Sequence, residues 1–259
     1  LSCALWLDTF GVACRWVDAC GRVGGTLYRI RHAIENLPGT IGLDGAALAQ
    51  RLRTQAEQQG LRIELAFVHS IDTELLEAHC SEGTSRPRFI VLATGTSPRK
   101  LGFDDEDALQ GRLVFHSSHE VCARLSPGPI VVVGGGDGAF EAALVLADAG
   151  FAVTLAHRAA SAHRARRLFR ERVAARTAIR VLPSTVLSGW LPRANSLLVE
   201  LESPRERHEL ECQGVVLKLG AIPNLPSLIG PLRMLPGGFV AVDEHCESSA
   251  PGLFAIGDI

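Results

Sequence analysis

The feature that most constrains this chain is an apolar strand pattern that runs into a glycine-rich loop and then into a helix. The strand pattern at 130–133 leads into Gly134, Gly136 and Ala139, which have the spacing of a G-x-G-x-x-G/A fingerprint. A second strand pattern at 151–157 completes a βαβ unit. The segment therefore predicts a parallel α/β sheet with a dinucleotide site at the loop.

Each residue of this loop has a physical task in such a site. Gly134 allows the tight turn, and Gly136 lets the backbone approach a pyrophosphate. The charge of that group meets the N–H groups and the positive dipole end of the following helix. Ala139 permits close packing of the helix on the strand. The alternative, a glycine-rich turn without a ligand, is disfavoured by the strand–loop–helix context.

The end of the second strand indicates which nicotinamide cofactor fits. NAD sites place an acidic residue about 20 residues after the loop, whereas this strand ends in His157 and Arg158. Arg158, Arg164, Arg166 and Arg167 could instead hold a 2′-phosphate through guanidinium contacts. The pattern favours NADP over NAD.

Composition and charge bear on the alternatives for this basic segment. A solvated helix face is the alternative for some of these arginines, above all Arg170 and Arg172. A nucleic-acid patch is disfavoured, because Phe169 is the only interleaved aromatic residue and the formal net charge of the chain is −2. No apolar run approaches the roughly 18 residues of a membrane span. The sequence predicts neither a nucleic-acid nor a membrane partner.

The seven cysteines are spread over the chain without a C-x-x-C or any other metal-ligand spacing. They are typical of reduced cysteines in a cytoplasmic protein and predict no metal site.

The remaining pattern predicts further elements and a domain border. We expect helices at 1–9 and 44–59, strands at 12–17 and 62–71, and a strand at 89–95 that is buried on both faces. An acidic stretch at 104–107 and a Ser-Pro-Gly-Pro segment at 126–129 bracket a shift in composition. We interpret this shift as the crossing into a second domain. Further strands are expected near 179–189, 197–202 and 210–219.

Several short motifs occur in a characteristic order along nearly the whole chain. They are V-D at 17–18, G-G-T-L at 24–27, E-N-L-P-G at 35–39, A-T-G at 93–95, G-G-G-D-G-A at 134–139, H-R at 157–158, G-A-I-P-N at 220–224 and A-I-G-D at 255–258. This order resembles the FAD- and NAD(P)-dependent pyridine nucleotide oxidoreductases, most closely their thioredoxin-reductase-like branch.

The resemblance implies two Rossmann-like (doubly wound, three-layer) dinucleotide-binding domains, one inserted in the other. An FAD domain would comprise 1–111 and 233–259, and the inserted NADP domain would comprise 112–232. By position, Asp18 would meet the adenosine ribose of FAD and Asp258 its ribityl chain. The other implied FAD residues are Gly24, Gly25, Thr26, Asn36 near the flavin, Thr94, Gly95 and Gly257. Without the resemblance, a strand-end cap, a turn and polar loop residues would explain these positions.

The chain departs from the family pattern at its ends. The glycine loop that holds the FAD phosphates would lie just before Leu1, and a helix would follow Asp258. We therefore expect a chain truncated at both ends, with FAD retention weakened by the loss of that phosphate site.

The chain also departs from the pattern at the redox centre. Thioredoxin reductases carry a C-x-x-C shortly before the second glycine loop, where this chain reads F-H-S-S-H-E-V-C at 115–122. Cys122 has no partner at that spacing. The H-S-S run is also similar to some flavin monooxygenases, and the lack of the dithiol is similar to the ferredoxin–NADP reductases of this fold. His116 and His119 are either proton donors near the flavin or polar loop residues.

The resemblance implies an NADPH-dependent flavoprotein reductase, which passes hydride from NADPH to FAD and electrons to an external acceptor, ferredoxin-like or a small molecule. Two alternatives stay open. One is a disulfide reductase whose cysteines lie outside this segment, and the other is a non-catalytic dinucleotide-binding or redox-sensing module. A homodimer is compatible with the family.

Overall fold

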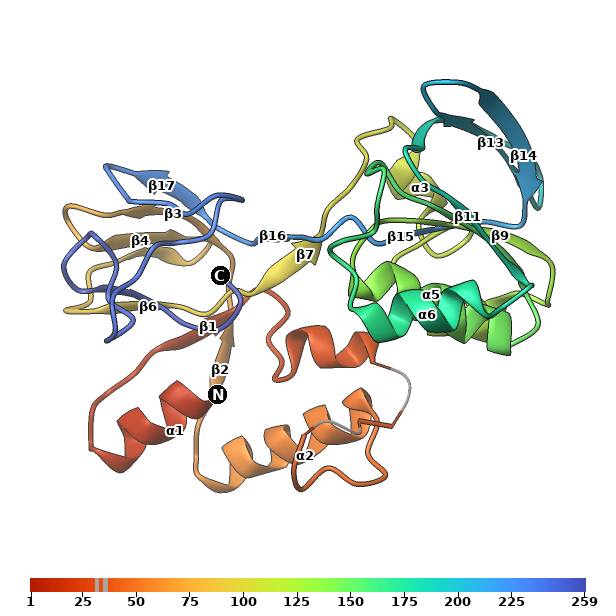
Figure 1. Cartoon of the computed structure of the whole chain (residues 1–259). Coiled ribbons are helices and arrows are strands. Elements are labelled where there is room, and N and C mark those ends of the chain that lie inside the picture. The colour runs from red at the N-terminus through yellow and green to blue at the C-terminus, as the bar shows by residue number, and fades with distance from the viewer. Residues whose placement is uncertain (31–32, 35–36) are drawn as a thin grey trace. The chain divides into compact units, whose positions relative to one another are not determined.

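The computed structural model describes residues 1–30, 33–34 and 37–259 (Figure 1). The chain divides into two compact units, an outer unit of Leu1–Ser97 and Ile222–Ile259 and an inserted unit of Pro98–Ala221. The two crossings between the units are strands β7 (Thr96–Pro98) and β16 (Ala221–Pro223), which pair with each other as a two-stranded sheet.

The compact inserted unit, Pro98–Ala221, begins and ends earlier than the 112–232 that the resemblance implies. At its start, the Trp190 indole Nε1–H donates to the Asp105 carboxylate at 2.7 Å and its ring meets Phe103 edge-on, with centroids 4.6 Å apart. The acidic stretch therefore belongs to the inserted unit, where it forms the short helix α3 (Glu106–Leu109). After the unit ends, β17 (Ser227–Ile229) already pairs with a strand of the outer unit.

A parallel sheet of five strands forms the centre of the inserted unit, in the order β11-β10-β9-β15-β8. The strands are β8 (Val114–Phe115), β9 (Pro129–Val133), β10 (Ala152–Ala156), β11 (Ile179–Leu182) and β15 (Val215–Leu217). Helices α4 (Ser118–Arg124), α5 (Asp137–Asp148) and α6 (Arg167–Ala174) lie on one face. From β9 the chain continues to β10 and β11 on one side, and β15 lies on the other. The order of strands thus reverses at the β9–β15 pair.

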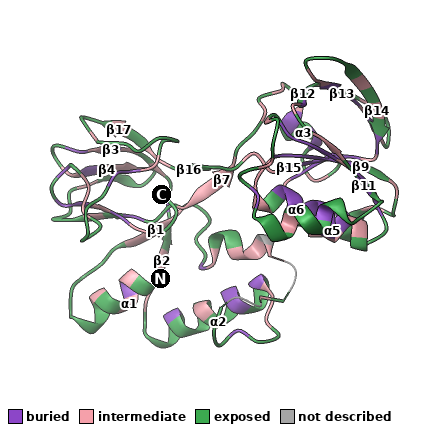
Figure 2. Cartoon of the chain, in the orientation of Figure 1, coloured by how far each residue is buried: buried purple, intermediate pink, exposed green. Residues whose placement is uncertain are grey.

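Alternating side chains of β9 build two cores. Ile130 and Val132 pack into the cluster on the helical face, whereas Val131 and Val133 pack into the cluster on the opposite face. An antiparallel sheet of β12 (Val186–Pro192), β13 (Leu197–Glu202) and β14 (Arg207–Cys212) covers that opposite face. The inserted unit therefore has three layers, as Figure 2 shows by the buried strands between exposed outer surfaces. The predicted three layers are present, with an antiparallel sheet as the third.

The described part of the outer unit contains three small sheets. Strands β1 (Trp16–Asp18) and β2 (Ile63–Leu65) pair in parallel near helices α1 (Ser2–Thr9) and α2 (Gly45–Gln58) and the 3₁₀ helix η1 (Gly25–Arg29). The second sheet joins β3 (Val68–Asp72), β4 (Glu77–Cys80), β5 (Gly83–Ser85) and β17, and the third joins β6 (Ile90–Leu92) to β18 (Leu253–Ala255). A small core around Ile71 and Leu253 connects the last two sheets.

Two expectations for the outer unit are wrong. The run 89–95 is not buried on both faces, because β6 pairs with β18 alone in the described residues, and Phe89 is 61% exposed. The run 62–71 forms two strands instead of one, and the backbone N–H of Ala66 between them donates to the carbonyl of Asp18 at 3.3 Å. The predicted helices at 1–9 and 44–59 are confirmed as α1 and α2. Within the described residues, no helix is both long and apolar enough to cross a membrane.

The contact between Trp190 and Asp105 makes residues that precede the expected border part of the inserted unit. Replacing Asp105 by alanine removes a charged acceptor from a half-buried indole, which we expect to lower the free energy of unfolding by about 1–2 kcal/mol. Asp104→Ala is the matched control, since Asp104 is exposed, and should change stability by less than about 0.5 kcal/mol. Urea denaturation of both variants measures this. Equal effects would contradict the assignment.

Candidate dinucleotide site

The turn between β9 and α5 requires glycine at position 134. Gly134 has φ +149°, and a Cβ there would collide with the backbone carbonyl of Lys218, which follows β15. The same Cβ would lie 3.0 Å from the Cβ of Ala139, which is 1% exposed on the buried face of α5. The predicted tasks of Gly134 and Ala139, a tight turn and close packing, therefore match the geometry.

The next glycines leave open space at the start of α5. A Cβ on Gly136 would have no atom of the described structure within 4 Å, and the φ of −104° at this position is one that any residue can adopt. Gly136 is the N-cap of α5 and has no side chain to satisfy the first N–H groups of the helix. An unobstructed loop with unsatisfied donors at the positive end of a helix fits a pyrophosphate.

The four candidate arginines of the 2′-phosphate seat divide into two pairs. Arg166 binds Asp137 through its Nε at 2.7 Å and its backbone N–H at 2.7 Å, and Arg167 binds Glu171 at 2.6 Å. Arg158 and Arg164 are exposed and form no salt bridge with any residue that the structure describes. Of the four candidates, Arg158 and Arg164 are thus the two without a carboxylate partner among the described residues.

His157 lies beneath the loop instead of on its surface. It is 3% exposed, and its Cβ would lie 3.3 Å from a Cβ on Gly135. Burial lowers the pKa of His157, with a backbone hydrogen bond at Ala159 opposing it, so the ring is neutral near pH 7. Its buried Nδ1 has no hydrogen-bond partner among the described residues. The predicted direct contact of His157 with the cofactor stays a prediction.

The residues expected to bind FAD form two groups in the outer unit. Asp18 ends β1, and its Oδ1 accepts the N–H of Cys20 at 2.7 Å. Gly24 has φ +111°, and a Cβ there would be 2.6 Å from the Cβ of Ala49 on α2, so the turn into η1 requires glycine. Gly25 and Thr26 continue into η1. Asn36 lies outside the described residues.

The second group leaves the same edge of the β6–β18 pair. Because these strands run parallel, Thr94 and Gly95 follow β6 where Gly257 and Asp258 follow β18. Gly95 and Gly257 both have positive φ, and a Cβ on either would meet no atom within 4 Å. No hydrogen bond or ion pair between described residues joins this group to the first.

Both groups fit the less charged parts of FAD, because they offer carboxylates for sugar hydroxyls and open glycine backbone. The described part of the outer unit has no strand–glycine loop–helix of the kind that begins at Gly134.

Asn224 is a functional candidate that the motif contained but to which sequence reasoning assigned no role. Its Nδ2 donates to the Thr94 carbonyl at 3.2 Å, and its backbone N–H donates to the Gly95 carbonyl at 2.8 Å. The Ser97 hydroxyl donates to its Oδ1 at 2.7 Å. Asn224 therefore fixes the A-T-G loop, which explains why an asparagine occurs at the end of G-A-I-P-N.

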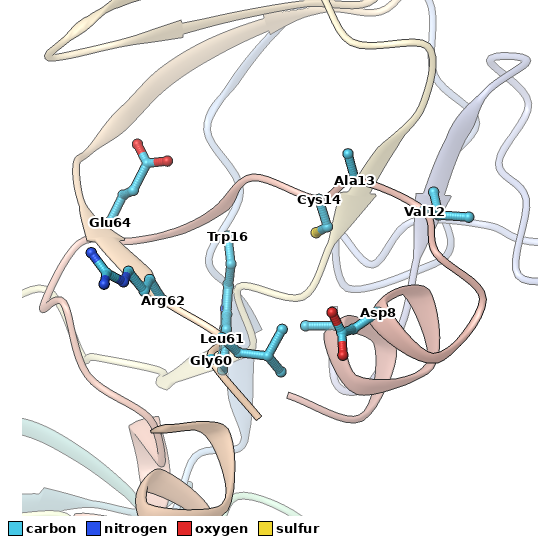
Figure 3. A pocket seen from close by; sticks show the side chains of 10 residues that line it. Asp8, Val12, Ala13, Cys14, Trp16, Gly60, Leu61, Arg62 and Glu64 are labelled. Carbon is cyan, nitrogen blue, oxygen red and sulfur yellow. The ribbon is translucent and has the colours of Figure 1, made fainter. Parts of the chain in front are cut away.

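Two pockets of about 310 Å³ each lie away from all the predicted site residues. Figure 3 shows the first, between α1 and the β1–β2 sheet, where Asp8, Cys14 and Trp16 line it together with Arg62. The second lies at the amino ends of β9 and β15, opposite the glycine loop. Nucleotides bind at the carboxyl ends of parallel strands, so neither volume marks the dinucleotide site.

Neither the positions nor the protonation states of Cys122 and Cys212, the cysteines of the inserted unit, are those of a redox-active dithiol. Cys122 is exposed on α4, which lies on the helical face of the sheet, whereas Cys212 packs into the cluster on the other face. Burial raises the pKa of Cys122 and raises that of Cys212 to about 12, so both are thiols near pH 7.

Comparison with known proteins decides the family. The model of the pyridine nucleotide-disulphide oxidoreductases matches residues 28–259. The chain belongs to this family. Its members are FAD- and NAD(P)H-dependent oxidoreductases, which confirms the resemblance and the predicted cofactors, FAD and NADP.

Similarities to individual proteins support the assignment to the pyridine nucleotide-disulphide oxidoreductase family. The thioredoxin reductase of Treponema pallidum is 29% identical over 88% of this chain and 75% of its own length. One of the alkyl hydroperoxide reductase subunits of Pseudomonas putida is 28% identical over 93% of this chain, which spans 48% of that relative. The crystal structure of T. acidophilum thioredoxin reductase has a TM-score of 0.80 at 21% identity, covering 99% of this chain and 85% of that one. This similarity confirms the predicted α/β fold class.

Alanine substitutions at Gly134 and Gly136 should affect different properties, the first the stability of the fold and the second NADPH binding. Gly134→Ala forces a left-handed alanine against the Lys218 carbonyl and should lower the free energy of unfolding by about 3 kcal/mol or more. Gly136→Ala should lower it by less than about 1 kcal/mol, while its methyl group blocks the pyrophosphate and weakens NADPH binding. Denaturation curves and calorimetric titration with NADPH measure both. A Gly136→Ala protein with wild-type affinity would contradict the placement of the ligand.

Proposed function

We propose that the chain is part of an NADPH-dependent flavoprotein reductase that delivers electrons to an external acceptor. The observation that carries the nucleotide assignment is that Arg158 and Arg164, after β10, are exposed and have no carboxylate partner among the described residues. Arg166 and Arg167, in contrast, are each paired with a carboxylate. Two such cations where NAD sites place an acid favour a 2′-phosphate.

The residues of the inserted unit would bind and orient the nucleotide. The loop Gly134–Gly136 and the start of α5 would hold the pyrophosphate, and Arg158 and Arg164 the 2′-phosphate. Asp18 and Asp258 of the outer unit would hold sugar hydroxyls of FAD, and Asn224 would keep the A-T-G loop in place beside them. FAD, when bound, supplies the two-electron chemistry, so no side-chain acid or base is required for that step.

The absence of a C-x-x-C within these 259 residues supports an acceptor outside them. Cys122 and Cys212 lie on opposite faces of one sheet and are protonated, so neither can relay electrons as half of a dithiol. The acceptor would be ferredoxin-like or a small molecule. A cytoplasmic location and a homodimer stay predictions.

A second candidate is a disulfide reductase with its cysteines in another segment. The names of its relatives, a thioredoxin reductase and one of the subunits that make up an alkyl hydroperoxide reductase, favour it. Reduction of a thioredoxin by a protein containing only these 259 residues would exclude the need for such a segment.

The arginine assignment predicts selectivity between nucleotides. Arg158→Ala should weaken NADPH binding by at least about tenfold, because a charged hydrogen bond is lost, and leave NADH binding unchanged. Arg170→Ala is the matched control, since Arg170 is an exposed arginine on α6. Calorimetric titrations with both nucleotides measure the effect. Equal losses with NADPH and NADH would refute the 2′-phosphate seat.

The cysteine assignment predicts resistance to thiol reagents. Alkylation of the FAD-loaded protein should leave NADPH oxidation with an artificial one-electron acceptor within about twofold of the untreated rate, because electrons that pass from FAD to such an acceptor need no thiol. Cys122→Ser should behave in the same way. If alkylation abolishes turnover and Cys122→Ser prevents that loss, Cys122 takes part in the reaction.

A further inference from the structure

Lys218 is a basic residue at the loop that none of the motifs accounts for. It directly follows β15, and its carbonyl is the group that excludes any side chain at Gly134. Its backbone N–H donates to the Val133 carbonyl at 2.8 Å, so the position of Lys218 is fixed relative to the end of β9. This residue therefore lies at the point where the strand order reverses, where open α/β sheets bind ligands.

The side chain of Lys218 lies along the start of α5. Its Cδ would be 3.9 Å from a Cβ on Gly138, the second residue of that helix. Glu141, one turn further along the helix, is the carboxylate whose charge acts on Lys218, and no salt bridge joins Lys218 to a residue that the structure describes. Burial lowers the pKa of Lys218, which Glu141 partly opposes.

A cation at this place is electrostatically unfavourable without a ligand. The start of a helix carries a partial positive charge, so an ammonium group beside it is repelled. Partial burial adds a desolvation cost. An anion at the loop would remove both costs, because it would interact favourably with the helix and with the lysine. Lys218 and the start of the helix together would therefore attract a more negatively charged ligand than the start of the helix alone.

The strand order decides which part of a dinucleotide Lys218 would meet. His157 and Arg158 follow β10, on one side of β9, and define the adenosine side. Lys218 follows β15, on the other side. A dinucleotide that crosses the loop therefore places its nicotinamide half over β15.

We infer that Lys218 binds the phosphate on the nicotinamide side of NADPH. The inference rests on the proposed function. It assigns the two ends of the nucleotide to different cations, with Arg158 and Arg164 at the 2′-phosphate and Lys218 at the distal phosphate of the pyrophosphate. Lys218 would then bind the part of the ligand that carries the reactive ring, without taking part in the reaction itself.

Two ligands can distinguish the role of Lys218 from that of Arg158 and Arg164. NADPH has both phosphates of the pyrophosphate, whereas adenosine 2′,5′-bisphosphate has the 2′-phosphate and the adenosine-side phosphate only. We expect Lys218→Met in the full chain to weaken NADPH binding about tenfold and to leave adenosine 2′,5′-bisphosphate binding within about twofold. Lys218→Arg should retain most of the affinity for NADPH. Arg158→Ala should weaken both ligands.

Calorimetric titration gives these affinities, and thermal unfolding of the ligand-free proteins controls for folding. Ligand-free Lys218→Met should melt at the wild-type temperature or above it, since a repelled charge is removed. A lower melting temperature, an equal loss for both ligands or an unchanged NADPH affinity would each overturn the assignment. Wild-type protein that binds neither ligand would refute the proposed function and this inference with it. Wild-type protein that binds NADPH, together with an unaffected Lys218→Met, would refute the inference alone.

Discussion

The close approach of β9 to β15 is the constraint on which the candidate site depends. Parallel pairing places the backbone of Gly134 against the carbonyl of Lys218, which leaves no room for a side chain. The same approach brings Ala139 under the loop and so directs the start of α5 toward the carboxyl ends of the strands. Only a chain without a Cβ at this point can combine the strand pair, the turn and the helix direction.

Carboxylates then determine which of the surrounding cations remain for a ligand. Asp137 and Glu171 each hold one arginine, and exposed ion pairs of this kind contribute little to stability. These ion pairs instead fix where the arginines lie. Arg166 is held at the start of α5, where Asp137 compensates its charge. Arg158 and Arg164 have no such carboxylate among the described residues and stay exposed beside the end of β10.

The inserted unit could be predicted from the sequence because its signals are local. The strand at 130–133, the glycine loop and the helix occur within one stretch, and alternation along β9 matches two cores. The strands of the outer unit are harder to predict from the sequence. An apolar run such as 89–95 indicates that a strand forms, but not how many neighbouring elements bury it. Phe89 is exposed for this reason. The compact inserted unit begins before the expected residue 112, and the hydrogen bond between Trp190 and Asp105 that joins the earlier residues to it links positions distant in sequence.

The same distinction applies to the site. Glycine requirements follow from backbone sterics and were visible in the sequence, whereas the pairing of Arg166 with Asp137 depends on how a loop folds back on α5. The role of Asn224 likewise depends on three contacts with a loop more than a hundred residues away in the chain.

His157 and Lys218 place two basic side chains on opposite sides of the loop, and burial lowers the pKa of both. For His157, a folded-state pKa below the unfolded value of about 6.5 means that its neutral burial stabilises the fold fully above that pH, and that this stabilisation is lost as the pH falls below it. Lys218 carries its desolvation cost throughout the neutral range, because its unfolded pKa is near 10.4. A bound anion favours the charged form of both groups. In the ligand-free loop the desolvation cost of the Lys218 ammonium group therefore remains, and the negative charge of a bound pyrophosphate would offset it.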